Sequence, residues 1–173
     1  MLIFSALFFA ACQSGRDRLA AEIAEKETRL FSDSMHQLNP TLAEEQVLNY
    51  KVFAEKFPAD SMAPEYLFKG ADLANGLGRG NEAISMLKQL CTSYPQHARA
   101  ETGLFMQAFI FETTLQRPDS AIVLYTEYLK KYPGHQLAQA AEFSLMQLKS
   151  GMSAEDVVRM FEQKNDSAAA AAQ

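Results

Sequence analysis

Only a few side chains in this sequence could perform acid–base or metal chemistry, and they lie far apart along the chain. The three histidines are His36, His97 and His135, and the two cysteines are Cys12 and Cys91. Zinc sites gather three or four such ligands at about 2 Å from one ion, and acid–base catalysis needs paired groups within hydrogen-bond reach. The spacing of these residues predicts neither arrangement. We therefore expect no catalytic residues, no metal, no cofactor and no enzymatic activity.

Two of the histidines share a sequence context. His97 and His135 each follow an aromatic–proline pair at the same offset, and Asp60 takes that offset after an earlier pair. A polar side chain just ahead of a helix can accept a hydrogen bond from the unpaired N–H groups of the first turn. The pattern therefore predicts three equivalent turn residues beside helix starts.

Cys12 follows an apolar run, residues 2–11, that is broken only by Ser5. As a helix this run is about 15 Å long, half of a bilayer core, so it is too short to span a membrane. It has the length of the apolar region of a secretory signal. The segment Phe9-Ala10-Ala11-Cys12 resembles the lipobox of bacterial lipoproteins, although Phe9 stands where leucine is usual and no Lys or Arg precedes the run.

The lipobox resemblance implies a lipoprotein signal peptide at 1–11, a lipidated tether at 12–18 and attachment to a membrane through a lipid on Cys12. The alternative is an uncleaved apolar N-terminus that carries a cysteine by chance. If Cys12 is lipidated, Cys91 is the one remaining thiol, and no disulfide can form within the chain. We expect Cys91 to be buried as a small apolar side chain.

The composition is that of a folded, helix-rich protein. The chain has 173 residues, of which 48% are hydrophobic and 21% charged, which is too apolar for intrinsic disorder. The net charge of −5 and the pI of about 5.2 argue against a nucleic-acid partner, since phosphate-binding surfaces need clustered Lys and Arg. The same charge gives no overall electrostatic attraction to anionic lipid.

The main signal is internal repetition. An aromatic–proline pair occurs at Phe57-Pro58, Tyr94-Pro95 and Tyr132-Pro133, at intervals of 37 and 38 residues. Apolar and small residues repeat at the same period: Ala63, Ala100 and Ala138; Phe68, Phe105 and Phe143; Ala71 and Ala108; Ala83 and Ala121; Ile84 and Ile122; Leu87 and Tyr125; Leu90 and Tyr128. A fixed period of this length indicates stacked supersecondary units.

Each unit reads as a helix hairpin, because apolar residues recur three and four positions apart and Gly or Pro interrupts the pattern. The expected helices are 19–38, 41–56, 63–75, 82–93, 98–114, 118–131, 136–149 and 153–163. Asn39-Pro40 starts the helix at 41–56, in which Thr41 and Glu44 also have the spacing of a capping box. Leu19, Ile23, Lys26 and Leu30 have coiled-coil spacing, but two heptads favour packing of this face on the stack over an independent coil.

The repeats resemble the tetratricopeptide-repeat (TPR) family over roughly residues 41–149. The matching positions are Leu67, Ala71, Ala83, Leu87 and Pro95 in one unit, and Leu104, Ala108, Phe111, Ala121, Tyr125 and Pro133 in the next. The resemblance implies an all-α, right-handed solenoid of antiparallel helix pairs, with three to four repeats and seven or eight helices. Gly70 and Ala74 stand where larger residues are usual, which predicts loose packing in the first unit.

We therefore expect a helical domain at 19–163 and a disordered tail at 164–173, which ends in alanines. The expected repeat units are 19–56, 57–93, 94–131 and 132–163.

In this family the first helix of each pair lines the concave surface, so the resemblance implies a protein-binding groove. The expected inner positions are Glu65, Phe68, Asp72, Asn75, Thr102, Phe105, Phe109 and Glu112, continued by Phe143 and Gln147. Such a groove suits a peptide with apolar anchors and some positive charge. The alternative is that Phe105 and Phe109 are core residues, since their helix is apolar almost all round.

A lipid anchor followed by TPR units resembles two bacterial envelope families. They are the TPR lipoprotein of the outer-membrane β-barrel assembly machinery and the periplasmic TPR partner of the Tol-Pal system. The resemblance implies a membrane-tethered scaffold that binds an envelope protein or peptide segment and faces the periplasm, on the outer membrane rather than the inner. A glycan-binding lipoprotein and a soluble cytoplasmic TPR adaptor are the alternatives.

Overall fold

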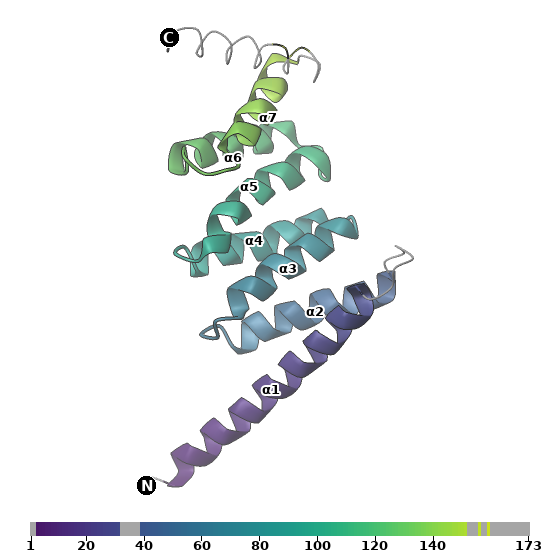
Figure 1. The fold of residues 1–173 in the computed structure, drawn as a ribbon, viewed down its shortest axis with the longest axis vertical. Coiled ribbons are helices and arrows are strands. Elements are labelled where there is room, and N and C mark those ends of the chain that lie inside the picture. Colours follow the sequence, from purple (N-terminus) through teal and green to yellow (C-terminus); the bar gives the residue numbers. More distant parts are fainter. Residues whose placement is uncertain (1–2, 32–38, 152–155, 157–158, 160–173) are drawn as a thin grey trace, which may run out of the picture. The chain divides into compact units, whose positions relative to one another are not determined.

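The computed structural model describes residues 3–31, 39–151, 156 and 159, and every regular element within them is a helix (Figure 1). The helices are α1 (Ile3–Phe31), α2 (Pro40–Lys56), α3 (Ala63–Gly76), α4 (Gly80–Ser93), α5 (Ala98–Thr113), α6 (Pro118–Lys131) and α7 (Ala138–Ser150). This arrangement confirms the predicted all-α class. No helix in the described part of the chain has the length and apolarity needed to cross a membrane.

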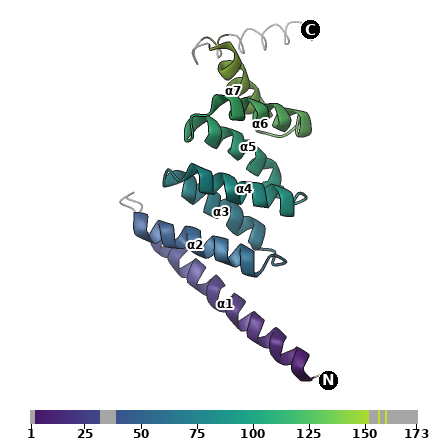
Figure 2. The ribbon, with the colours of Figure 1, turned by 180° about the vertical axis from the view of Figure 1, so that it is seen from behind.

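The chain divides into two compact units, Met1–Gly103 and Leu104–Gln173. In the first unit, α2 packs between α1 and α3, and α3 packs on α4 (Figure 2). In the second unit, α6 packs on α7. Consecutive helices therefore pack as neighbours within each unit, as expected for helix hairpins.

The core of the first unit is aromatic where α2 meets α3. The ring of Tyr66 stacks on Tyr50 with centroids 5.3 Å apart and meets Phe53 edge-on at 4.7 Å. All three of these aromatic side chains are buried, as are Leu67 on α3 and Leu87 on α4. Aromatic burial of this kind contributes through both apolar area and ring geometry.

Helix α1 lays one face on this core. Ile23 and Leu30 are buried, and the buried Gln46 side chain of α2 donates from Nε2 to the carbonyl oxygen of Ile23 at 3.1 Å. The predicted packing of this helix on the stack is thus confirmed. The described part of this helix runs to Phe31, and residues 32–38, with His36, lie outside the described residues, so the predicted end at Leu38 stays a prediction.

The start of α2 corrects one prediction. The N-cap residue is Asn39, whose Oδ1 accepts a hydrogen bond from the backbone N–H of Leu42 at 3.1 Å. Pro40 then takes the first helical position, where its missing donor costs nothing. The capping box predicted at Thr41 and Glu44 was wrong, because Asn39 is a stronger cap two residues earlier.

The packing at Gly70 was also predicted wrongly. A Cβ atom at Gly70 would overlap the terminal methyl group of Met86 and would lie 3.2 Å from Cβ of Tyr50. Gly70 is thus a point of close approach between α3 and its two neighbours, and the large residue next to it comes from α4. The first unit is tightly packed there because Met86 and Tyr50 fill the space that a larger side chain on α3 would occupy.

The three turns that follow the aromatic–proline pairs confirm the predicted equivalence. Oδ1 of Asp60 accepts the N–H of Met62 at 2.8 Å, Nδ1 of His97 accepts that of Arg99 at 3.2 Å, and Nδ1 of His135 accepts that of Leu137 at 3.1 Å. Each turn residue also donates its own N–H to the carbonyl of the aromatic residue three positions earlier. The same turn therefore leads into α3, α5 and α7.

The C-terminal prediction of a helix at 153–163 falls outside the described residues except at Asp156 and Arg159, and the tail at 164–173 falls outside them entirely. Residues 3–14 are described only as part of helix α1, so the signal peptide and the tether stay predictions.

Candidate functional site

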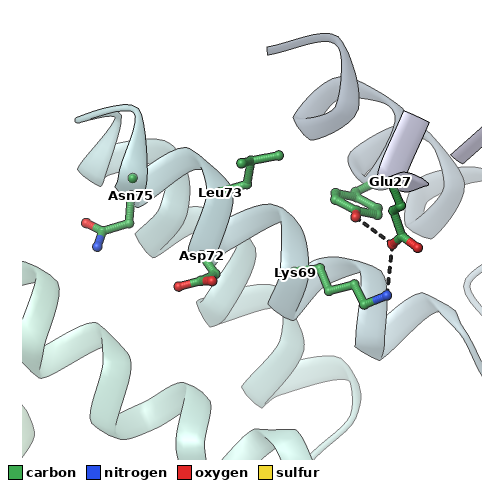
Figure 3. Close-up of a pocket in the computed structure, with 7 residues that line it drawn as sticks. Glu27, Lys69, Asp72, Leu73 and Asn75 are labelled. Carbon is green, nitrogen blue, oxygen red and sulfur yellow. Dashed lines mark hydrogen bonds and ion pairs between the residues drawn. The ribbon is translucent and has the colours of Figure 1, made fainter. Parts of the chain in front are cut away.

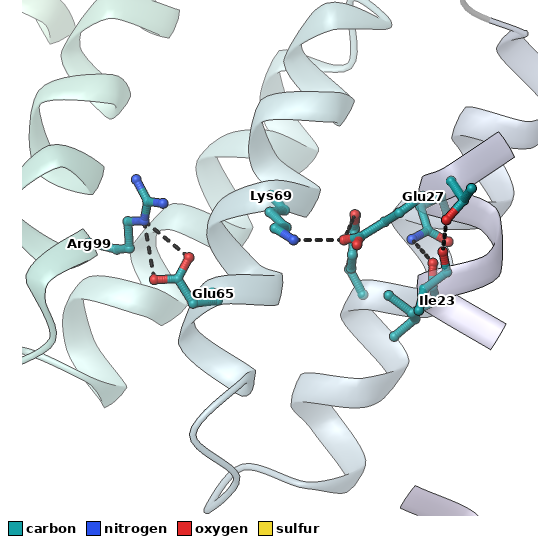
Figure 4. Close-up of polar contacts among 9 residues, drawn as sticks. Ile23, Glu27, Glu65, Lys69 and Arg99 are labelled. Carbon is teal, nitrogen blue, oxygen red and sulfur yellow. Dashed lines mark hydrogen bonds and ion pairs between the residues drawn. The ribbon is translucent and has the colours of Figure 1, made fainter. Parts of the chain in front are cut away.

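Helix α3 presents a row of charged and aromatic side chains that includes four of the predicted groove residues. Glu65 lies at the start of this row and pairs with Arg99, whose Nε contacts the two carboxylate oxygens at 3.1 and 3.2 Å (Figure 4). The Arg99 guanidinium also lies over the ring of Phe68, 4.6 Å from its centroid. Glu65 and Phe68 are therefore already engaged by an exposed side chain from the first turn of α5.

The middle of the row is tied to α1. Nζ of Lys69 contacts Oε1 of Glu27 at 2.8 Å, and the same oxygen accepts the hydroxyl of Tyr50 at 2.6 Å. Burial and the hydrogen bond to Glu27 raise the pKa of Tyr50 well above its usual range. The phenol thus stays protonated and keeps donating to Glu27 at any physiological pH.

The far end of the row opens into a cleft of about 440 Å³ in the first unit. It is lined by Glu27, Tyr50, Lys69, Asp72, Leu73, Asn75 and Gly76. In Figure 3 the Lys69 side chain reaches toward Glu27, whereas Asp72 extends away from that pair. Within the described part of the chain, the exposed Asp72 carboxylate has no ion-pair or hydrogen-bond partner.

The electrostatics of this cleft favour a cation. Glu27 is compensated by Lys69, so the unpaired charge among the lining residues is the negative charge of Asp72. Leu73 provides apolar surface in the same cleft. A Lys or Arg side chain could place its charged end at Asp72 and its aliphatic stem against Leu73, as long basic side chains commonly do.

In the second unit, the predicted residues Phe105 and Phe109 have different environments. Phe105 meets the rings of Tyr125 and Tyr128 edge-on, with both centroids 5.6 Å away. Phe109 stacks on Phe105 at 6.5 Å and is 39% exposed. Phe105 is therefore a packing residue between α5 and α6, and Phe109 covers it and presents its outer face to solvent.

The remaining predicted positions are less open. Glu112 accepts the hydroxyl of the buried Tyr125 at 2.6 Å, so its carboxylate serves packing within the second unit. Thr102 and Asn75 are half-buried, and Asn75 lines the cleft beside Asp72. Of the eight predicted groove residues, Asp72, Asn75 and Phe109 thus have the placement expected of a binding surface.

Sequence reasoning missed Glu27 and Lys69, which form one wall of the cleft. Lys69 follows Glu65 by four residues, a spacing that predicts an ion pair on one helix face. Its partner instead comes from α1, far away in sequence, and no local pattern shows that contact. Cys91 was expected to be buried but is half-buried, with its thiol 3.4 Å from the carbonyl oxygen of Ala100.

The described residues contain no group of three His, Cys, Asp or Glu side chains placed to hold a metal ion. The groups available to bind a ligand are the Asp72 carboxylate near Leu73 in the first unit and the exposed Phe109 ring in the second.

Comparison with known proteins gives one family. The family model described as tetratricopeptide repeat matches residues 65–97 and 102–135. The two matched stretches begin within α3 and α5 and end at the equivalent turn residues His97 and His135. No curated protein matches the chain. Residues 65–97 and 102–135 therefore match tetratricopeptide repeats, a helical architecture that in that family serves as a scaffold for protein–protein interactions.

Proposed function

We propose that this protein is a membrane-tethered scaffold of the bacterial cell envelope that binds a peptide segment of another envelope protein. A lipid on Cys12 anchors it to the membrane, with the outer membrane as the expected site, and the repeats face the periplasm. The support for the tether is the sequence around Cys12, and the support for peptide binding is the repeat architecture together with the two surfaces described above.

The observation that carries the peptide-binding proposal is the unpaired Asp72 carboxylate in the cleft of the first unit. Its neighbours Glu27 and Lys69 compensate each other at 2.8 Å, so the site offers one negative charge next to Leu73. Extended or helical peptides bind repeat surfaces through side-chain pockets of this kind. The preferred segment has a Lys or Arg close to an apolar anchor.

Crosslinking and pull-down from whole cells tests both parts of the proposal. Wild type is compared with Cys12→Ala, Asp72→Lys and the control Glu127→Lys, which reverses an exposed charge on α6. We expect wild type and Glu127→Lys to capture the same partner from the membrane fraction. Asp72→Lys should stay in that fraction but lose the partner, and Cys12→Ala should lack the added mass of a lipid.

The two parts can fail separately. If the wild-type protein from the membrane fraction has the mass of an unmodified chain, the lipid anchor is wrong. If Asp72→Lys captures the partner as well as Glu127→Lys does, the cleft is not the binding surface.

A further inference from the structure

A second groove lies between α1 and α2, on residues that the peptide-binding proposal does not use. It encloses about 510 Å³. Its apolar floor is formed by Leu19 on α1 and by Val52 and Phe57 at the C-terminal end of α2. The two positively charged residues that line it, Arg18 and Lys56, come from different helices.

These two cations are available to a ligand. Neither Arg18 nor Lys56 has an ion-pair or hydrogen-bond partner among the described residues, and both are exposed. Their neighbour Arg16 differs, since its Nε contacts Asp60 at 2.8 Å. Two unpaired cations that share one groove stand out in a chain whose net charge is −5.

The one acidic residue that lines the groove, Glu22, is engaged by neighbouring side chains. Glu22 accepts hydrogen bonds from Asn49 and from Lys26, both at 3.0 Å. The pKa of Glu22 is lowered, mainly by the hydrogen bond from Asn49 and then by that from Lys26. Lys26 also pairs with Glu45 at 3.1 Å, so it offsets the charge of Glu22 only in part. The lining residues still carry two positive charges against one negative charge, which leaves an excess of positive charge above an apolar floor.

The position of the groove in the chain indicates which anion it meets. Arg18 is six residues after Cys12, a separation of about 9 Å as a helix and at most about 20 Å as an extended chain. If Cys12 carries a lipid, the groove is therefore held close to the membrane surface. Electrostatic attraction to anionic lipid acts over about 8–10 Å at physiological salt, so a groove at this distance is within or near its range.

We propose that the α1–α2 groove binds the headgroup of an anionic phospholipid, with Arg18 and Lys56 contacting the phosphate and Phe57 and Val52 contacting the apolar part next to it. The inference rests on the proposed tether for its choice of ligand, because an acidic peptide would have no reason to be concentrated beside Cys12. Its consequence is that the anchored protein lies with α1 against the membrane.

The test measures vesicle binding by the full chain with Cys12→Ala, which cannot be lipidated. Vesicles of phosphatidylcholine alone are compared with vesicles of equal parts phosphatidylcholine and phosphatidylglycerol. The apolar run 2–11 contributes to both, so the ratio of the two affinities isolates the contribution of the anionic headgroup. We expect about a tenfold preference for the anionic vesicles, falling as salt is raised.

Adding Arg18→Gln and Lys56→Gln should remove that preference, whereas adding Lys88→Gln and Lys130→Gln should keep it. The two pairs of substitutions change the net charge equally, and none of the four residues has a described ion pair, so all variants should melt at the same temperature. An anionic preference that is absent, or that survives Arg18→Gln with Lys56→Gln, would overturn the inference.

Two further outcomes identify the source of the anion and separate this inference from the tether. Inorganic phosphate at the concentration of the vesicle phosphate should not compete, and full competition would indicate a soluble-anion site instead. Lipidation of the wild type is scored independently by the mass of the membrane-fraction protein. A lipidated protein whose groove shows no anionic preference contradicts only the present inference, and an unlipidated protein with the preference contradicts only the tether.

Discussion

The hydroxyl of Tyr94 donates a hydrogen bond to the carbonyl oxygen of Pro58 at 2.7 Å, across 36 residues of sequence. Tyr94 begins the second aromatic–proline pair, and Pro58 completes the first. The bond therefore joins equivalent turns of consecutive repeats in the first unit. Because Pro58 sits in a turn, its carbonyl has no helical partner, and a side chain from the next repeat takes that place.

Tyr94→Phe should destabilise the first unit slightly. It removes one hydrogen bond that is open to solvent, which costs about 0.5–1 kcal/mol in the free energy of unfolding. The matched control is Tyr132→Phe, which removes a hydroxyl with no described partner and should change stability by less than about 0.3 kcal/mol. Urea unfolding of both variants checks this, and equal effects would show that the Tyr94 bond contributes nothing.

Asp60→Asn should alter the acid dependence of stability. The hydrogen bond from the Arg16 side chain, more than any other contact, lowers the pKa of Asp60. A lowered folded-state pKa means that the unfolded chain binds more protons, so the added stability is present above the unfolded pKa of about 3.9 and is lost as pH falls through the folded value. The asparagine side chain of this variant would still accept the N–H of Met62 but would carry no charge.

Melting temperatures across the acid range measure this effect. Wild type should melt above the Asp60→Asn variant at pH 6, and the difference should shrink progressively below about pH 4. Arg16→Gln should give the same profile, and the double variant should add little to either single one. A difference that stays constant with pH would mean that the charge of Asp60 is irrelevant.

The equivalence of the turn residues predicts that they are interchangeable. His135→Asp should keep the stability of the second unit, because Asp60 accepts the corresponding backbone N–H in the first unit. His135→Ala removes that acceptor and also the partner of the buried Tyr128 hydroxyl, so it should cost about 1–3 kcal/mol in the free energy of unfolding. Thermal unfolding of His135→Asp and His135→Ala tests whether the turn residues are equivalent. A His135→Asp variant as unstable as His135→Ala would refute the equivalence.

The repeat period was enough to predict the helices and their turns. The helices from 63 to 131 were placed within one or two residues, because aromatic–proline pairs and glycines punctuate the chain there. The start of α2 at Asn39-Pro40 was predicted correctly, whereas the additional capping box at Thr41 and Glu44 was wrong because Asn39 is the stronger cap.

The candidate site was harder to predict, because it depends on contacts that no local pattern contains. The family resemblance pointed to Asp72, Asn75 and Phe109, which the structure leaves accessible or lining the cleft. It could not show that Arg99 pairs with Glu65 and lies over the ring of Phe68. Nor could it show that Lys69 pairs with Glu27. Those pairs join residues 34 and 42 positions apart, and charge alone does not select one partner among many.

Gly70→Ala should be destabilising although alanine is the better helix former. The helix propensity of alanine favours the variant by about 1 kcal/mol, but the new Cβ crowds Met86 and lies 3.2 Å from Cβ of Tyr50. We expect a net loss of about 1 kcal/mol. Gly76→Ala is the control, since nothing lies within 4 Å of its Cβ position, and it should be neutral or stabilising. A stabilised Gly70→Ala variant would show that α3 and α4 have room to separate.

Phe105 and Phe109 lie on one helix and stack on each other, yet their substitutions should destabilise the protein to different extents. Phe105→Ala removes a ring that meets both Tyr125 and Tyr128, so we expect a loss of about 2–3 kcal/mol in the free energy of unfolding. Phe109→Glu places a charge on a ring position that is 39% exposed, so the loss should stay below about 1 kcal/mol.

The two readouts of this last comparison, urea unfolding and partner capture, separate core from surface. A folded Phe109→Glu that no longer captures the partner assigns the ring to the binding surface of the second unit. If Phe109→Glu instead unfolds as readily as Phe105→Ala, then the exposed edge of Phe109 is needed to shield Phe105, and both rings belong to the packing between α5 and α6. The peptide would then have to be recognised in the cleft around Asp72, because the described part of the second unit presents no other predicted aromatic position with a comparably exposed ring.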